Sequence, residues 1–212
     1  MIDFKEISVI VQGPIIGSSC DLKKYRLTEI CIKSIRKHLP GSQIILSTWE
    51  DSDVNNLDYD ELVLNKDPGN FLMSPYEENN VERQIISTLN GIKKSTGKYS
   101  FKLRSDIKIL GNSFLKYFDK YKKYNKDWHF LEKRIIVPSL VTRDPEEWES
   151  PFCASDWASF GLTKDMLNLW DINLPSEEEK NWFSNKFRPI EVLNKMLDLI
   201  ILQCKFDIGF SI

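Results

Sequence analysis

Residues 7–11 read Ile-Ser-Val-Ile-Val, and this nearly continuous β-branched run predicts a strand buried on both faces of a sheet. A helix is expected next, over residues 21–39, because apolar side chains recur there at helical spacing before Pro40 and Gly41. The same patterns predict further elements in the first half of the chain: strands over residues 43–48, 61–64 and 99–103, a polar loop with Asp67-Pro68-Gly69 and Ser74-Pro75, and a helix capped by Asn80 with the apolar stripe Val81, Ile85, Leu89 and Ile92.

Strands that alternate with amphipathic helices are typical of an α/β protein, whose mainly parallel sheet is covered by helices on both faces. We expect a single domain of this class, because 212 residues are enough for one core of ordinary size. Ligands of such sheets bind beyond the carboxyl ends of the strands. Residues 12–14, 49–53 and 104–106 follow or end predicted strands, so they are expected at that edge.

The second half of the chain has a less regular pattern. An aromatic, acid-containing segment lies at residues 152–161, and the chain ends on an apolar stretch, so we expect a shortened version of a longer protein. The remaining predictions for this half are a lysine- and tyrosine-rich helix over residues 113–126, a strand over 134–140, and helices over 164–171 and 189–202.

Composition excludes several classes of protein. Lys and Arg total 29 against 31 Asp and Glu, and this balance argues against a nucleic-acid-binding protein. Four cysteines and two histidines without metal-ligand spacing argue against a zinc site. Gly13 and Gly17 form neither of two common phosphate-binding motifs, G-x-x-x-x-G-K-[ST] and G-x-G-x-x-G. The sequence contains no signal-peptide pattern and no apolar run long enough to span a membrane, so a soluble cytoplasmic protein is expected.

The stretch Lys102-Leu103-Arg104-Ser105-Asp106 places three charged residues on one face of a predicted strand. One interpretation is an edge strand with a solvated face. The other is a diphosphate site, in which Lys102 and Arg104 neutralise the phosphates and Asp106 binds a metal ion or a sugar hydroxyl. The spacing alone does not separate these two interpretations.

Other candidates each have a structural alternative. Asp156 lies beside aromatic residues, where a carboxylate suits general-base catalysis, but it or Ser155 could simply cap a helix. Asn80 could be a plain helix cap, with Arg83 and Gln84 reaching a ligand one turn further on. The lysine-rich stretch over residues 116–126 fits a solvated helix face better than a surface that meets an anionic membrane.

Six stretches of the sequence, taken together, resemble the WavE lipopolysaccharide-synthesis family of bacterial glycosyltransferases. They occur in order and cover most of residues 7–165. The stretches are VIVQGPI (9–15), CIKSIRKHLPGSQIILSTWEDSDV (31–54), LDYDELVLNKDPG (57–69), NNVERQIIST (79–88), GKYSFKLRSDI (97–107) and SDWASFGL (155–162).

The resemblance implies a GT-A-like, Rossmann-like fold with a nucleotide-sugar-binding half (residues 1–110) and an acceptor-side half (residues 111–212). Many such enzymes carry an Asp-x-Asp metal motif where this chain has Arg104-Ser105-Asp106. Asp106 would then hold a single Mn²⁺ or Mg²⁺ ion, or Arg104 would stabilise the leaving diphosphate in place of a metal. The expected donor-binding residues are Gln12, Gly13 and Pro14 around the base and ribose, Asp53 near the base or ribose, Asn80 at the helix start, and Arg83, Lys102 and Arg104 on the diphosphate, with Asp156 as the catalytic base.

The resemblance implies transfer of a sugar from a nucleotide-sugar donor to a lipopolysaccharide or capsular glycan, or to a lipid-linked glycan, with peripheral contact to the membrane and no nucleic-acid partner. A non-catalytic or degenerate nucleotide- or sugar-binding domain is the alternative from another class. A sugar nucleotidyltransferase is a third, but its basic loop is missing here, since no Lys or Arg follows the first strand before Lys23.

Overall fold

The computed structural model describes residues 2–17, 26–74, 77–121, 130–142, 154–176 and 178. Its helices are α1 (Leu27–His38), α2 (Val81–Ile92) and α3 (Thr163–Trp170), with 3₁₀ turns at Phe4–Glu6 and Ser113–Tyr117. The described strands that form the main sheet are β1 (Ile7–Gln12), β2 (Gln43–Trp49), β3 (Glu61–Asn65), β6 (Tyr99–Arg104) and β7 (Ala158–Leu162). A separate hairpin pairs β4 (Phe71–Ser74) with β5 (Glu77–Asn79).

The protein is therefore of the α/β class, as predicted, with a mixed sheet in the order β3-β2-β1-β6-β7. β1 is parallel to both β2 and β6, and β2 is parallel to β3, whereas β7 runs antiparallel to β6. The chain moves outward from β1 to β3 and then crosses to the other side of β1. The crevice between β1 and β6 is thus the topological switch point, where open α/β sheets bind their ligands.

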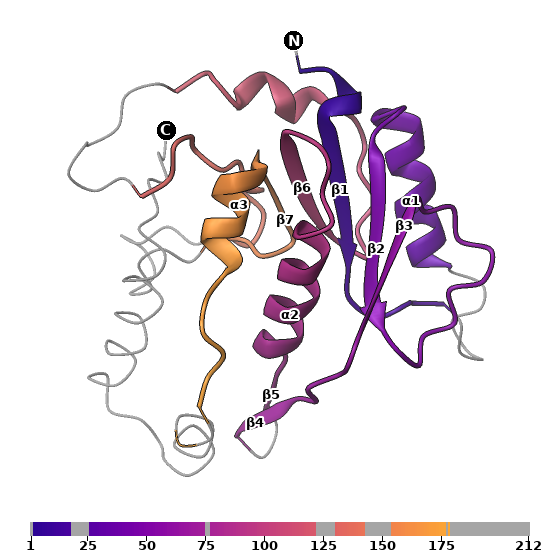
Figure 1. Ribbon diagram of the computed structural model, residues 1–212, viewed down its shortest axis with the longest axis vertical. Helices are drawn as coiled ribbons and strands as arrows, with labels where there is room; N and C mark the ends of the chain where they lie inside the picture. The colour runs from indigo at the N-terminus through magenta and orange to yellow at the C-terminus, as the bar shows by residue number, and fades with distance from the viewer. Residues whose placement is uncertain are drawn as a thin grey trace.

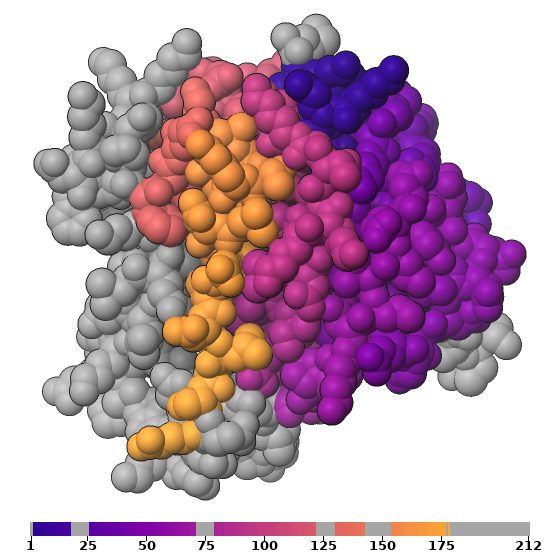
Figure 2. Space-filling model, viewed as in Figure 1, coloured from indigo at the N-terminus to yellow at the C-terminus, as the bar shows by residue number. Residues whose placement is uncertain are grey.

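Helices cover both faces of the sheet (Figure 1). α1 packs on one face, where the alternate residues Ile7, Val9 and Val11 of β1 join the core. The opposite face of β1 presents Ile10 to Ile92 of α2, in a smaller cluster. In Figure 2, α3 lies beside α2 over this second face. No helix in the described ranges is both long and apolar enough to cross a bilayer.

Several local predictions differ from the structure. The segment predicted as a strand over residues 134–140 forms only an isolated bridge, between Ile136 and Phe160, while the acidic aromatic segment at residues 152–161 contains all but the last residue of β7. The predicted polar loop after β3 contains the β4–β5 hairpin. The predicted helix over residues 113–126 is a short 3₁₀ turn at its start, and its residues 122–129 lie outside the described part, as does the helix predicted over 189–202.

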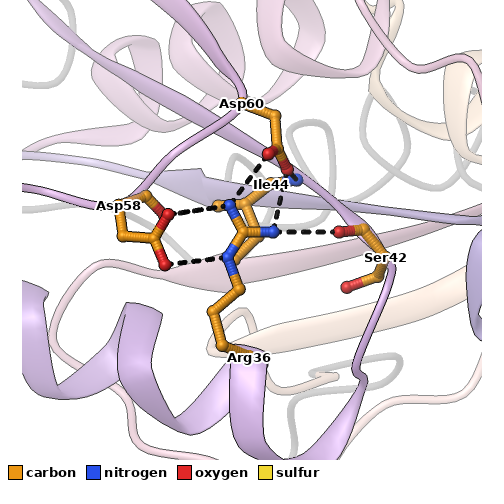
Figure 3. Close-up of polar contacts among 5 residues, drawn as sticks. All are labelled: Arg36, Ser42, Ile44, Asp58 and Asp60. Atoms are coloured by element: carbon orange, nitrogen blue, oxygen red, sulfur yellow. Dashed lines mark hydrogen bonds and ion pairs between the residues drawn. The ribbon is translucent and has the colours of Figure 1, made fainter.

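Arg36 joins the end of α1 to the segment that enters β3 (Figure 3). Its guanidinium donates to both carboxylate oxygens of Asp58 at 3.0 and 3.1 Å and to both oxygens of Asp60 at 3.0 and 2.9 Å, and it also reaches the carbonyl of Ser42 at 3.2 Å. Asp60 in turn accepts the backbone N–H of Ile44 at 2.6 Å. Burial would raise the pKa of Asp60, but Arg36 and this N–H outweigh it and lower the pKa below 3.8. Arg36 thereby holds α1, β2 and β3 together.

We expect Arg36→Met to lower the free energy of unfolding by about 1–2 kcal/mol at pH 7, measured by urea denaturation. The Asp60 part of this contribution is present above pH 3.8 and is lost as the pH falls through the lowered pKa of the folded state. The difference between wild type and variant should therefore shrink in acid. Exposed Lys37, on the same helix, provides the matched control: Lys37→Met should change the stability by less than about 0.5 kcal/mol.

Candidate functional site

A cavity of about 730 Å³ opens at the carboxyl edge of the sheet, at the switch point between β1 and β6. This volume lies within the usual range for small-molecule sites, of about 300–1,000 Å³. Segments far apart in the sequence meet here: the ends of β1, β2 and β6, the start of α2, and the loops before β4 and β7. The lining residues are Gln12, Gly13, Pro14, Ile16, Trp49, Asp67, Asn79, Asn80, Val81, Arg83, Gln84, Arg104, Ser105, Asp106 and Asp156.

The end of β1 forms one wall of the cavity through its main chain. Gly13 has a backbone angle φ of +114°, which residues other than glycine rarely adopt. Its N–H donates to the carbonyl of Ser47 at 3.1 Å. Ser105 closes the turn from the other strand, since its hydroxyl donates to the carbonyl of Pro14 at 2.6 Å and its N–H to that of Gln12 at 2.9 Å. The cavity wall between β1 and β6 is therefore fixed by hydrogen bonds.

Gln12 is almost fully buried and rests on a polar layer beneath the cavity. The hydroxyl of Ser87 on α2 lies 2.8 Å from its Oε1. Behind it, Ser47 donates to the carbonyl of Ser87 at 2.6 Å and accepts a hydrogen bond from Asn65 at 3.0 Å. These buried bonds hold β1, β2, β3 and α2 in register below the ligand space.

Arg104, the last residue of β6, forms a two-point ion pair with Asp106. Its Nε and Nη2 lie 3.1 and 2.8 Å from the two carboxylate oxygens. The hydrogen bond to Asp106 raises the pKa of Arg104 further above its ordinary value. Because β6 lies between β1 and β7, the edge-strand interpretation of the Lys102-to-Asp106 stretch is wrong. The predicted grouping of Arg104 and Asp106 on one side is confirmed.

Arg83 is the second arginine of the cavity and is paired in the same way. Its Nε and Nη2 donate to the two oxygens of Asp67 at 2.7 and 2.6 Å, and its Nη1 donates to Asn80 at 2.8 Å. The Arg83 hydrogen bonds hold the pKa of Asp67 below its ordinary value. Asn80 occupies the N-cap position of α2, as predicted, but its side chain holds Arg83, and the side chain of Asn79 accepts the N–H of Val81.

Asp156 projects into the cavity from the loop before β7. Its Oδ2 accepts a hydrogen bond from the Gln84 side chain of α2 at 2.6 Å. The residue is exposed, so the apolar environment expected from its aromatic neighbours is not what surrounds it. The helix-cap alternative for Ser155 or Asp156 is also wrong, because the chain continues into β7 rather than a helix.

Lys102 is the predicted phosphate-binding residue that the structure places elsewhere. It is fully buried behind the cavity and is not one of the lining residues. Its Nζ donates to the main-chain carbonyl of Asp156 and lies 5.3 Å from the ring centroid of Trp170. Burial lowers the pKa of Lys102 to about 7, although the nearby Asp156 carboxylate favours the charged form.

The structure thus gathers most of the predicted site residues at one cavity, but not Lys102 or Asp53. The carboxylate of Asp53 accepts a hydrogen bond from the Asn55 side chain at 2.8 Å. Asp67 lines the cavity and was not predicted, whereas Gln84 was expected to lie near a ligand and also lines the cavity. Asp67 could have been predicted, because it comes two residues after β3 and so lies at the same carboxyl edge of the sheet. The hydrogen bond from Gln84 to Asp156 was not predicted, because it joins residues that lie 72 positions apart in the sequence.

A metal ion held by protein ligands alone does not fit the described residues of this cavity. Within the described ranges, no three His, Cys, Asp or Glu residues are grouped as metal ligands. Asp106, the predicted ligand, directs both carboxylate oxygens at Arg104. A divalent ion would therefore depend on phosphate and water oxygens for nearly all of its ligands.

The family model described as WavE lipopolysaccharide synthesis matches residues 7–195. The chain belongs to this family. The match spans every strand of the main sheet and all the residues that line the cavity, and it ties the WavE chain to lipopolysaccharide synthesis and hence to a glycan-related substrate. A search of curated proteins found no match.

Proposed function

We propose that this WavE protein is a glycosyltransferase, which moves a sugar from a nucleotide-sugar donor to a growing surface glycan. The observation that carries the proposal is the presence of two guanidinium groups, Arg83 and Arg104, on a cavity of about 730 Å³ at the switch point of an α/β sheet. Arginine forks match phosphate oxygens in a bidentate manner, so the pair suits a diphosphate.

Donor binding would exchange carboxylate partners for phosphate partners. Both guanidiniums are paired with aspartates, Arg83 with Asp67 and Arg104 with Asp106. A diphosphate carries enough charge to take both guanidiniums, and the base and ribose would lie along the wall formed by Gln12, Gly13 and Pro14. GT-A-like binding of this kind follows from the family resemblance, which the switch-point cavity supports.

In the proposed reaction, the oxygen of an acceptor hydroxyl attacks the anomeric carbon of the donor sugar. The hydroxyl proton passes to the carboxylate of Asp156, which lines the cavity and is held by Gln84. The bond from the anomeric carbon to the diphosphate oxygen breaks, and the electron pair leaves with the nucleoside diphosphate. Arg104 stabilises the negative charge that develops on this leaving group.

We propose that Arg104 supplies the charge stabilisation that a metal ion provides in Asp-x-Asp enzymes. The alternative is one Mn²⁺ or Mg²⁺ ion held by Asp106 together with donor phosphates. The proposed acceptor is a lipopolysaccharide or capsular glycan, free or lipid-linked, and the proposed setting is the cytoplasm, with peripheral contact to the membrane and without a nucleic-acid partner. We further propose that residues 1–110 bind the donor and residues 111–212 serve the acceptor side.

A thermal-shift panel tests the donor site directly. The ligands are UDP, GDP, CDP, CMP and their common sugar conjugates, each with Mn²⁺, Mg²⁺ or EDTA. A ligand at a hundred times its dissociation constant stabilises the folded state by about 2.7 kcal/mol, so one nucleotide class should raise the melting temperature clearly. The nucleotide that does so names the donor class.

The EDTA samples separate the two accounts of charge stabilisation. A shift that survives EDTA supports Arg104 in place of a metal, and a shift that EDTA abolishes supports Asp106 with an ion. If no nucleotide changes the melting temperature of the folded protein, the donor-site proposal is wrong. If a nucleotide sugar binds but is never turned over with any glycan acceptor, the non-catalytic binding domain replaces the transferase.

A further inference from the structure

Lys102 is among the largest fully buried side chains of the described residues, and it lies on an inner strand of the sheet. Its ammonium has one hydrogen-bond partner in the described part of the chain, the main-chain carbonyl of Asp156. The ring of Trp170 on α3 lies near it, with the centroid 5.3 Å from Nζ. No carboxylate of the described residues forms an ion pair with it.

A buried ammonium without an ion-pair partner is costly, because the folded protein replaces its hydration with few contacts. A methionine or leucine at this position, near Trp170 and opposite Ser159 of β7, would not carry that cost. The burial of a lysine is therefore best explained by a role at its one hydrogen-bond partner among the described residues, and that carbonyl belongs to the residue proposed as the catalytic base.

Asp156 is held at two points from two different elements. Lys102 of β6 binds its main-chain carbonyl from behind the cavity, and Gln84 of α2 binds its carboxylate at 2.6 Å from the side. The next carbonyl, that of Trp157, accepts the N–H of Arg104 at 3.1 Å. The short loop before β7 is thus fastened to the same strand that carries the diphosphate-binding arginine.

We propose that Lys102 is a positioning residue, whose ammonium fixes the loop of Asp156 so that its carboxylate faces the acceptor hydroxyl. This inference rests on the proposed function for the role of Asp156, but the fastening of the loop can be measured without any reaction. Lys102 does not touch the donor in this arrangement, so its loss should lower kcat and leave the KM for the donor unchanged.

The hydrogen bond from Lys102 to the main-chain carbonyl of Asp156 should depend on pH near neutrality. Burial lowers the pKa of Lys102 to about 7, the carboxylates of Asp156 and Asp106 favour the charged form, and Arg104 opposes it. Above that pH the amine is neutral and is a weaker donor to the carbonyl. The helices packed on this face carry four further charged residues, Glu82 and Arg83 on α2 and Lys164 and Asp165 on α3, and no ion pair is found between any of them and Lys102 among the described residues.

The variant Lys102→Met removes the charge and the donor at nearly constant volume. It should fold, because the cost of the buried ammonium at pH 7 disappears with it. Exposed Lys98, at the entrance of the same strand, gives the matched control Lys98→Met. Hydrogen exchange of the peptide spanning residues 154–158 is measured at pH 6.0 and 8.5 and corrected for intrinsic rates.

In the wild type and in Lys98→Met, protection of this peptide should fall about fivefold between the two pH values. In Lys102→Met the protection of this peptide should be low at both pH values. With an active donor–acceptor pair, Lys102→Met should lower kcat about tenfold with an unchanged donor KM, and the alkaline limb near pH 7 in the kcat profile should disappear.

Three results would overturn the inference. One is wild-type protection of residues 154–158 that does not change with pH, which needs no variant to measure. Another is Lys102→Met with wild-type protection, and the third is a raised donor KM with unchanged kcat. Should the wild type bind nucleotides yet transfer no sugar, the proposed function fails while the exchange experiment still decides the role of Lys102.

Discussion

Asp156→Asn is expected to lower turnover by more than about a hundredfold, because the amide cannot accept the proton of the acceptor hydroxyl. Donor binding should persist, since Asn retains an oxygen for the hydrogen bond from Gln84 and the two arginines are untouched. The measurement is kcat with a saturating nucleotide sugar and a glycan acceptor, with the nucleotide-induced thermal shift recorded for the same sample.

Asp171→Asn is the control for this substitution, because Asp171 is exposed after α3 and does not line the cavity. It should leave kcat unchanged. Near-normal turnover of Asp156→Asn would remove Asp156 as the base while leaving the transferase proposal intact. A loss of the thermal shift as well would mean that Asp156 contributes to donor binding rather than to proton transfer alone.

Arg104→Met is expected to lower kcat/KM by about a hundredfold to a thousandfold, because it removes a donor aimed at the charge that develops on the leaving diphosphate. Part of the loss should appear in binding, as a smaller thermal shift with the nucleoside diphosphate. The corresponding nucleoside, which has no phosphate, should bind the variant and the wild type alike. Steady-state kinetics and the thermal-shift panel together measure both parts.

Lys108→Met removes an exposed cation four residues further along and lies outside the cavity lining, so kcat/KM should not change. Arg104→Lys separates charge from shape, because lysine keeps the charge but lacks the planar fork. An Arg104→Met enzyme with wild-type kcat/KM and full nucleotide binding would contradict the proposed role of Arg104 in the donor site.

The elements predicted correctly from the sequence are those whose own residues carry a clear apolar pattern. β1, β2, β3 and β6 carry apolar runs, and α2 carries a clear stripe, so each was found to within a residue or two. β7 was missed because Ala158–Leu162 includes a small residue and a glycine, and its strand conformation comes from pairing with β6. The hairpin was missed because β4 and β5 pair only with one another and are short.

The candidate site was predictable as far as it follows from strand order. Gln12, Gly13, Arg104 and Asp106 meet because they end or follow neighbouring parallel strands. Lys102 was placed on the correct face but not at its correct depth, since sequence spacing gives the direction of a side chain and says nothing of what covers it. Here α3 and the loop of Asp156 cover it, and both come more than 50 residues later.

The paired arginines also set a threshold for what can occupy the cavity. Two guanidiniums and three carboxylates line it, and each guanidinium is already paired with an aspartate before any ligand binds. Orthophosphate or chloride can bind one arginine only by breaking that arginine's two-point ion pair with an aspartate, so its net free energy of binding is small. A ligand that binds both arginines gains the free energy of two interactions but loses its translational freedom only once, as a chelating ligand does. We therefore expect the cavity to remain empty amid the free phosphate of a cell and to respond to its ligand alone.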